Sequence, residues 1–209
     1  MKILIVDDHV VVREGLKRIL ADVFPRVTFG QAENAGQAIE LVMKEKWNVM
    51  LLDLSLVGRS GLDVLKQVQK THPKLPVLIL TMHEEEQFGV RAIKAGAAGY
   101  ITKGTAAKVL SEAIRHVLKG GKFITPTLAQ RLAAEVSEPD TKTMHEELSD
   151  REIEVLRKLA EGRTVKEIAH DLSLSHKTVS TYRMRMMRKM HFRTAAELTR
   201  YAIEHQLIR

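Results

Sequence analysis

The sequence predicts an α/β protein with a doubly wound, five-stranded parallel sheet, followed by a small all-α helix-turn-helix domain. Two observations in the 209-residue chain predict this division. Over residues 1–120, short apolar runs rich in β-branched residues alternate with stretches of helical spacing, a pattern typical of buried parallel strands joined by helices. From residue 148 onward the apolar spacing is helical throughout, and N-terminal capping signals recur.

The first domain is expected to contain five strands and five helices. The expected strands are Ile3–Val6, Val27–Phe29, Val49–Leu52, Val77–Leu80 and Gly99–Ile101. The apolar positions of the expected helices are Val12, Leu16, Ile19 and Leu20; Ala38, Leu41 and Val42; Leu62, Leu65 and Val68; Val90, Ile93 and Ala97; and Val109, Ala113 and Val117. Asn34 is a candidate N-terminal cap for the second helix.

The remaining chain is predicted to hold a linker at residues 121–145 and the helical domain at residues 146–209. A short helix is expected over Leu128–Val136, as a candidate extension of the first domain. The polar stretch Ser137–Thr143, with one proline, is typical of a linker. Four helices should follow, and their expected N-terminal caps are Ser149, Thr164, Ser175 and Thr194.

The composition excludes several classes of protein. No cysteine is present, so disulfide frameworks and thiolate metal sites are excluded, which is consistent with a reducing cytosol. No apolar run approaches the roughly 18 residues that a membrane helix needs, so no membrane partner is expected. Met1–Val6 runs directly into Asp7 and Asp8, which a secretory signal peptide would not contain. We therefore expect a cytoplasmic protein.

Polar side chains follow four of the five expected strands. Asp7 and Asp8 follow the first strand, Asp53 the third, Thr81 the fourth and Lys103 the fifth. Because ligands of an open α/β sheet bind beyond the carboxyl ends of its strands, these residues should converge. Three carboxylates repel one another, so the site calls for a divalent cation such as Mg²⁺, and Lys103 adds a fixed positive charge.

Such a site can transfer a phosphoryl group onto one of its own carboxylates. Asp53 would be the nucleophile, and Asp8, Asp53 and one main-chain carbonyl would hold the metal with support from Asp7. Lys103 and Thr81 would bind the phosphoryl oxygens. A single Asp at a strand end usually only begins a loop, and a single Thr usually caps a turn. Complementary groups at four strand ends favour the joint functional interpretation.

Four of these stretches resemble the receiver domain of bacterial response regulators, a flavodoxin-like fold, over about residues 1–120. They are Ile3–His9, Leu51–Leu54, Leu80–Thr81 and Gly99–Lys103. The resemblance implies a phosphoacceptor at Asp53, an acidic pair at Asp7 and Asp8, a metal-binding main-chain carbonyl at Ser55, a switch hydroxyl at Thr81, a switch aromatic at Tyr100 and the family's lysine at Lys103. It also implies that phosphorylation draws Thr81 toward the phosphate and turns Tyr100 inward.

Two positions depart from the receiver pattern. The family often has proline four residues after the phosphoacceptor, where this chain has Val57. A proline also commonly follows the lysine, whereas Gly104–Ala107 has none. Neither change removes a chemical group from the site, but both affect loop geometry and bear on the rate of phosphotransfer and the lifetime of the phosphate.

A basic helix is the main feature of the second domain. The chain has a net charge of +7, and residues 175–193 hold six Lys and Arg and no acidic residue. Two helices joined by a turn at Ser173–Ser175 follow the helix-turn-helix plan. The second helix should bury Val179, Tyr182, Met186 and Met190. Its opposite face is expected to meet a DNA major groove through Lys177, Thr181, Met184 or Arg185, and Arg188.

Residues 146–209 resemble the LuxR-type DNA-binding domain, notably at Leu148–Glu152, Glu161–Gly162, Lys166–Ala169 and Ser175–Tyr182. The resemblance implies base contacts by Ser180, Thr181 and Met184, and phosphate contacts by Lys177, Thr178, Arg185 and Arg188. The family often has Lys in place of Ser180, and Gly or Asn in place of Ser173 and His191. A receiver followed by this domain is the arrangement of NarL/FixJ-type response regulators.

The combined prediction is a two-component response regulator and not an enzyme: a sensor histidine kinase phosphorylates Asp53, which controls sequence-specific DNA binding and transcription. The expected partners are that kinase, DNA and, through transcription, RNA polymerase. The last helix, Ala195–Ile203, carries an apolar stripe of Leu198, Tyr201 and Ala202 that packs on its own domain or pairs two domains. A homodimer would read half-sites roughly 34 Å apart.

Three alternatives stay open. A phosphohydrolase that works through an aspartyl phosphate would share Asp53, but Ser55 stands where such enzymes place a second carboxylate. A DNA-binding regulator whose receiver no longer accepts phosphate is favoured by Val57 and disfavoured by the presence of every phosphorylation group. The basic helix alone is also compatible with a solvated face or an acidic membrane surface, although its apolar side lacks Trp and Phe.

Overall fold

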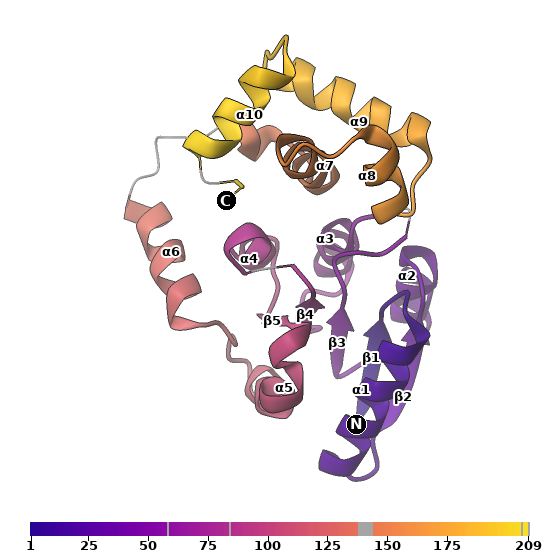
Figure 1. Ribbon diagram of the computed structural model, residues 1–209. Coiled ribbons are helices and arrows are strands. Elements are labelled where there is room, and N and C mark those ends of the chain that lie inside the picture. The colour runs from indigo at the N-terminus through magenta and orange to yellow at the C-terminus, as the bar shows by residue number, and fades with distance from the viewer. Residues whose placement is uncertain (58, 84, 138–143, 206, 209) are drawn as a thin grey trace. The chain divides into compact units, whose positions relative to one another are not determined.

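The computed structural model describes residues 1–209 except 58, 84, 138–143, 206 and 209 (Figure 1). The chain divides into two compact units, Met1–Ser137 and Glu138–Arg209. Residues 138–143 of the predicted polar linker lie outside the described residues. No described helix combines the length and the apolar character that crossing a bilayer requires.

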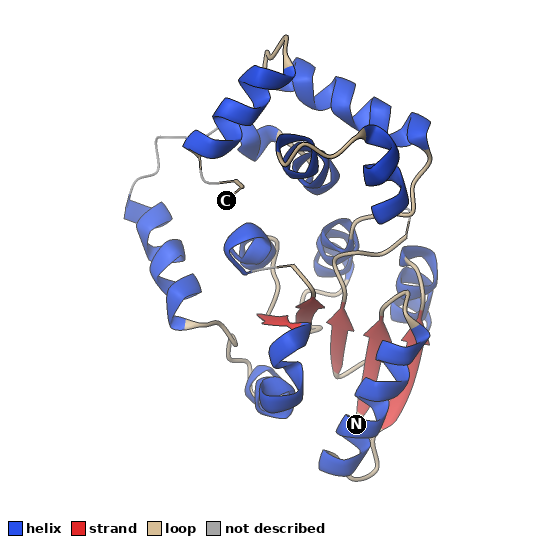
Figure 2. Cartoon of the chain, viewed as in Figure 1, coloured by secondary structure: helices blue, strands red, loops and turns tan. Residues whose placement is uncertain are grey.

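The first unit contains a five-stranded, all-parallel sheet with the order β2-β1-β3-β4-β5, drawn as red arrows in Figure 2. Its strands are β1 (Lys2–Val6), β2 (Thr28–Ala32), β3 (Val49–Leu52), β4 (Val77–Thr81) and β5 (Gly99–Thr102). The predicted fold class and all five strands are confirmed. The strand β2 continues past Phe29 to Ala32, and the apolar pattern missed this because β2 is an edge strand with partly exposed residues.

Helices cover both faces of the sheet. They are α1 (Val10–Val23), α2 (Ala35–Lys44), α3 (Gly61–Thr71), α4 (Glu85–Lys94), α5 (Lys103–Leu118) and α6 (Pro126–Ser137). Residues of α2, α3 and α4 pack with one face of the sheet, and residues of α1 and α5 pack with the other. Asn34 caps α2 as predicted, because its side chain accepts a hydrogen bond from the N–H of Gln37.

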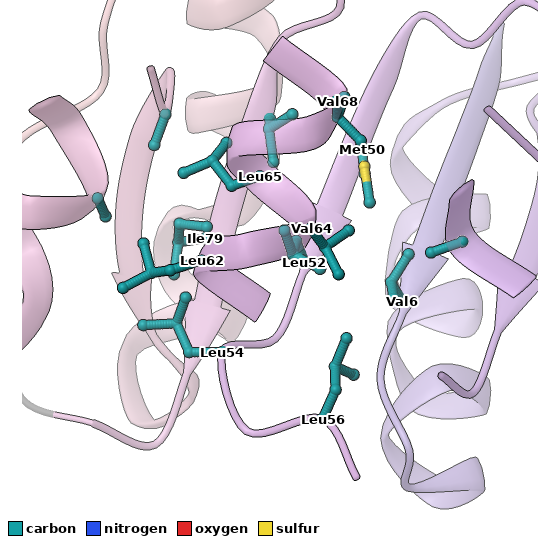
Figure 3. Close-up of a cluster of buried hydrophobic side chains, with 14 of the residues drawn as sticks. Val6, Met50, Leu52, Leu54, Leu56, Leu62, Val64, Leu65, Val68 and Ile79 are labelled. Atoms are coloured by element: carbon teal, nitrogen blue, oxygen red, sulfur yellow. The ribbon is translucent and has the colours of Figure 1, made fainter. Parts of the chain in front are cut away.

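The alternation of strand side chains separates the two layers of the core. Met50 and Leu52 of β3 point to the α3 side, where Figure 3 shows them in one cluster with Val64 and Val68. Leu51, between them, points to the other layer. Full burial of each such side chain contributes about 1.5–3 kcal/mol. This packing fixes the strands in register, and so fixes the loops that leave their carboxyl ends.

Helix α6 belongs to the first unit. The sequence places this helix within a predicted linker that spans residues 121–145. Leu128 of α6 is fully buried in the same core as α4. The Thr125 hydroxyl donates to the Glu85 carboxylate of α4, and the N–H of Leu128 donates to Thr125 Oγ1 (3.1 Å). Before the helix, the N–H of Phe123 donates to the carbonyl of Ala98 (2.8 Å). The chain up to Ser137 is therefore packed on the sheet domain.

The second unit is helical. Its elements are the 3₁₀ helix η1 (Met144–Glu147) and the α-helices α7 (Asp150–Ala160), α8 (Val165–Asp171), α9 (His176–Lys189) and α10 (Ala195–Glu204). The four predicted caps are confirmed: the side chains of Ser149, Thr164, Ser175 and Thr194 each accept a hydrogen bond from the backbone three residues later. Helices α8 and α9 form the predicted helix-turn-helix. Ile168 of α8 and Val179 of α9 are fully buried and lie in the same hydrophobic cluster.

Candidate functional sites

Asp53 lies directly beyond the carboxyl end of β3 and is 3% exposed. Its N–H donates to the carbonyl of Val6 (2.9 Å), and its carboxylate Oδ1 accepts from the N–H of Ser55 (3.2 Å). Gly61 lets the chain return close to this point, because a Cβ at that position would come within 2.1 Å of the Asp53 carbonyl oxygen. The backbone thus holds the Asp53 carboxylate in one place.

Lys103 joins the ends of β1 and β3 electrostatically. Its Nζ lies 2.7 Å from Asp53 Oδ2 and 2.7 Å from Asp7 Oδ2, so these carboxylate oxygens are at most twice that distance apart. Burial by itself would lower the pKa of the Lys103 ammonium. The attraction of Asp53 and hydrogen bonds to Asp53 and Asp7 outweigh that effect, so the pKa is raised above its ordinary value. Lys103 is therefore a fixed cation at neutral pH.

Asp7, Asp8 and His9 form a cluster directly after β1, with one possible ligand atom of each within 4.8 Å of the others. Asp8 Oδ1 is buried and accepts no hydrogen bond from the described residues, although His9 Nδ1 lies 2.7 Å from it. A buried carboxylate oxygen that accepts no well-aligned hydrogen bond is costly, and a cation would remove that cost. The carboxylates present therefore fit a hard divalent ion, which prefers oxygen ligands.

Thr81 and Tyr100, the two predicted switch residues, are both buried and both contact His83. Thr81 Oγ1 accepts a hydrogen bond from the N–H of His83 (3.4 Å). The Tyr100 hydroxyl donates to the carbonyl of His83 (3.0 Å), and the residue is only 2% exposed, so its ring points inward. The His83 ring also contacts Ser55: its Nε2 lies 2.8 Å from Ser55 Oγ.

The structure thus brings Asp7, Asp53 and Lys103 into direct contact, with Asp8 beside them and Thr81 at the same sheet edge. Sequence reasoning missed His9 and His83. A usable signal existed for both, because each is a polar residue one or two positions after a strand-end site residue. The period of the apolar residues gives no information about such loop contacts.

The basic face of α9 is the second candidate site. Val179 and Met186 are fully buried and Met190 is 1% exposed, as predicted for the inward face. Tyr182 is partly buried in the same cluster as Val179. The predicted DNA-contact residues lie on the accessible side of the helix. Lys177, Met184, Arg185 and Arg188 are exposed, and Thr178, Ser180 and Thr181 are half-buried.

Lys189 of α9 and the apolar stripe of α10 both serve the domain itself. Lys189, one of the six basic residues, donates to Glu152 Oε2 (2.6 Å), so its charge is balanced inside the unit. The predicted α10 stripe also lies inside the domain: Leu198, Tyr201 and Ala202 are buried in the core that α7 and α9 share. The stripe therefore packs on its own domain, and Ile203 is a large apolar residue of α10 that is exposed, at 61%.

Comparison with known families decides the identity of the two units. Residues 3–115 match the response regulator receiver domain, and residues 146–202 match the bacterial regulatory proteins of the luxR family. The chain belongs to the response regulators. The predicted NarL/FixJ-type combination of a receiver and a LuxR-type DNA-binding domain is thereby confirmed.

Relatives of this response regulator match it over nearly their whole length. The chain is 36% identical to the response regulator GacA of Pseudomonas aeruginosa over 209 residues, covering 100% of this chain and 98% of GacA. RcsB of Salmonella enterica serovar Typhimurium, solved on a promoter with the phosphate mimic BeF₃⁻, is 30% identical with a TM-score of 0.58, over 96% and 97% of the two chains. A structure of two RcsB dimers on two parallel DNAs is 28% identical with a TM-score of 0.59, over 96% and 97%.

Proposed function

We propose that Asp53 of this response regulator accepts a phosphoryl group from the phosphohistidine of a sensor kinase, and that this controls DNA binding by α9. The observation that carries the proposal is the Lys103 ammonium, which lies 2.7 Å from both Asp53 and Asp7. A phosphoryl group on Asp53 would meet this cation, and preorganised positive charge is the main requirement for transfer.

Asp8, Asp53 and the main-chain carbonyl of Ser55 would hold a Mg²⁺ ion, with Asp7 in support. The buried Asp8 Oδ1 that accepts no hydrogen bond among the described residues supports this assignment. When bound, Mg²⁺ neutralises charge on the carboxylates and on the transferred phosphoryl oxygens. Without it, Lys103 offsets the negative charge of the Asp7 and Asp53 carboxylates.

The transfer replaces a phosphorus–nitrogen bond by a phosphorus–oxygen bond. The Asp53 carboxylate attacks phosphorus, and the electron pair of the breaking bond stays on the nitrogen of the donor histidine. Lys103 and the Thr81 hydroxyl would bind the phosphoryl oxygens, and Tyr100, which is already inward without a phosphoryl group, would be held in that position. The protein therefore contributes position and charge, and the only reaction we assign beyond acceptance is slow loss of its own phosphate.

The DNA target is read by α9 from a homodimer in the cytoplasm. Lys177, Thr178, Arg185 and Arg188 would bind phosphates, and Ser180, Thr181 and Met184 would face bases. The Thr181 hydroxyl donates to the Lys177 carbonyl (2.9 Å), which leaves its oxygen to accept from a base amino group. The promoter-bound and dimeric RcsB structures support this arrangement. Contact with RNA polymerase would convert binding into regulation.

The proposal is tested by labelling the chain with a small phosphodonor and Mg²⁺, followed by intact-mass measurement. Asp53→Asn should abolish labelling because it removes the nucleophile. Asp22→Asn is the matched control, because Asp22 is an exposed carboxylate on α1 and its loss should leave labelling unchanged. Undiminished labelling of Asp53→Asn would refute the assignment of the phosphoacceptor.

A further inference from the structure

His83 contacts the three parts of the switch with three different groups. Its backbone N–H donates to Thr81 Oγ1 (3.4 Å), its carbonyl accepts from the Tyr100 hydroxyl (3.0 Å), and its ring Nε2 lies 2.8 Å from Ser55 Oγ. Ser55 follows β3 and Asp53, whereas His83 follows β4 and Thr81. The side-chain bond therefore joins the loop that carries the phosphoacceptor to the loop that follows β4.

The carbonyl of His83 matters because Tyr100 is buried. A buried tyrosine ring keeps its inward position only if its hydroxyl finds a partner, since an unsatisfied buried hydroxyl is costly. The partner here is a loop carbonyl, and Thr81 is bonded to the same residue by a long hydrogen bond. Anything that holds the loop at His83 also holds the acceptor for Tyr100.

We propose that His83 is a positioning residue of the switch: the Ser55–His83 side-chain bond fixes the loop after β4 so that the His83 carbonyl receives the inward Tyr100 hydroxyl. This inference deepens the proposed function, since it assigns the part that links the phosphoacceptor loop to the switch aromatic. Movement of the Ser55 loop on phosphorylation would then be transmitted to Tyr100 through one residue.

Ring packing is the competing explanation. The His83 ring lies 4.8 Å from the Phe88 ring of α4, at an interplanar angle of 54°, so its bulk alone could hold the loop. The two explanations separate cleanly by substitution. His83→Phe keeps an aromatic ring against Phe88 and removes the nitrogen, whereas Ser55→Ala removes the hydroxyl and leaves the His83 ring unchanged. Ser55→Thr retains a hydroxyl and serves as the conservative control.

The experiment uses the full chain with 3-fluorotyrosine, observed by ¹⁹F NMR. The chain has three tyrosines, so three signals are expected, and Tyr100→Phe identifies the Tyr100 signal. A soluble paramagnetic probe then measures how far the Tyr100 ring is exposed. Ser55→Ala and His83→Phe should each shift the ratio of inward to outward Tyr100 by about fivefold, the effect of one lost hydrogen bond. Ser55→Thr should resemble the wild type.

The results that would overturn this inference differ from the results that would overturn the proposed function. A Tyr100 signal in Ser55→Ala that matches the wild type in shift and probe accessibility would overturn the inference. An unchanged signal in His83→Phe would overturn it too, in favour of ring packing. Both results concern the unphosphorylated chain, so they do not depend on labelling. Failure of the wild-type chain to be labelled would instead remove the proposed phosphoacceptor and leave the Tyr100 result standing.

Discussion

The two functional sites of this response regulator place charge in opposite ways. In the receiver, opposite charges are gathered from strands far apart in the sequence and are nearly buried, with Lys103 13% exposed and Asp53 3% exposed. In the DNA-binding unit, like charges from one helix are exposed, as for Arg185 and Arg188. Unpaired like charges can lie close together only where water and salt screen their repulsion. The receiver site therefore needs internal compensation, and the DNA face needs a partner to supply it.

Removal of Lys103 should break the internal compensation and give the largest effect. In Lys103→Met, the buried carboxylates of Asp7 and Asp53 lose their cation, so the free energy of unfolding of the first unit should fall by ~3 kcal/mol without Mg²⁺. The raised pKa of Lys103 means that this stability is fully present below the ordinary value of 10.5 and is lost only as the pH rises through the raised value. Neutral pH is therefore suitable for the measurement.

Urea unfolding followed by the fluorescence of Trp47 reports on the first unit, because the single tryptophan lies there. Mg²⁺ should restore more stability in Lys103→Met than in the wild type, since a bound cation replaces the missing charge. Lys108→Met, on the exposed side of α5, is the matched control. Equal stability of Lys103→Met and the control would show that the carboxylates need no compensation.

Two neighbouring cations of α9 show the contrast between compensated and uncompensated charge within the second unit. Lys189 is paired with the 3%-exposed Glu152, whereas Arg188 is exposed. Lys189→Ala should therefore lower the free energy of unfolding of the second unit by ~2 kcal/mol, the value of a hydrogen bond to a charged group. Arg188→Ala should leave stability unchanged, weaken binding to all DNA sequences and reduce the salt slope by about 1.

Fluorescence anisotropy with labelled DNA at several salt concentrations measures the slope, and urea unfolding followed by circular dichroism measures stability. The folded fraction of Lys189→Ala should keep the wild-type slope. A reduced slope in Lys189→Ala would mean that the cation leaves Glu152 to bind phosphate, and an unchanged slope in Arg188→Ala would remove Arg188 from the DNA contact.

The same contrast explains what the sequence could predict. The positions of Asp53 and Lys103 follow from the order of strands, because side chains at the carboxyl ends of a parallel sheet share one edge. The faces of α9 follow from the helical period. The position of His83, two residues after Thr81, was a usable signal, but its contact with Ser55 was not predictable, since that contact depends on the separation of two loops. For α6, an extension of the first domain over Leu128–Val136 was a candidate from the sequence, but the contact of Leu128 with α4 beside Gly89 was not predictable.

The α10 stripe shows a third limit. Leu198, Tyr201 and Ala202 have a spacing that suits either a domain core or a dimer face, and periodicity does not distinguish the two. The structure assigns all three to the core of their own unit. A pairing surface on α10 must therefore use its other side, where Ile203 is exposed.

The smallest expected effect concerns how helices of the second unit end. Helices α7, α8 and α9 end in the same way: a residue with positive φ follows, and the next residue donates to a carbonyl five positions back. The residue is Gly162 (φ 85°) after α7, Ser173 (φ 50°) after α8 and His191 (φ 55°) after α9. Only glycine adopts this conformation without steric cost from a Cβ.

Ser173→Gly should therefore stabilise the second unit by ~0.5 kcal/mol, the relief of left-handed strain less the added entropy of an unfolded glycine. His191→Gly should gain less, because histidine is enriched several-fold in this conformation relative to most residues. Gly162→Ala is the opposite control and should destabilise by about 1 kcal/mol. Urea unfolding followed by circular dichroism measures all three. Destabilisation by Ser173→Gly would mean that the Ser173 side chain itself stabilises the turn. Serine at this position would then not simply replace the glycine that is common in the family.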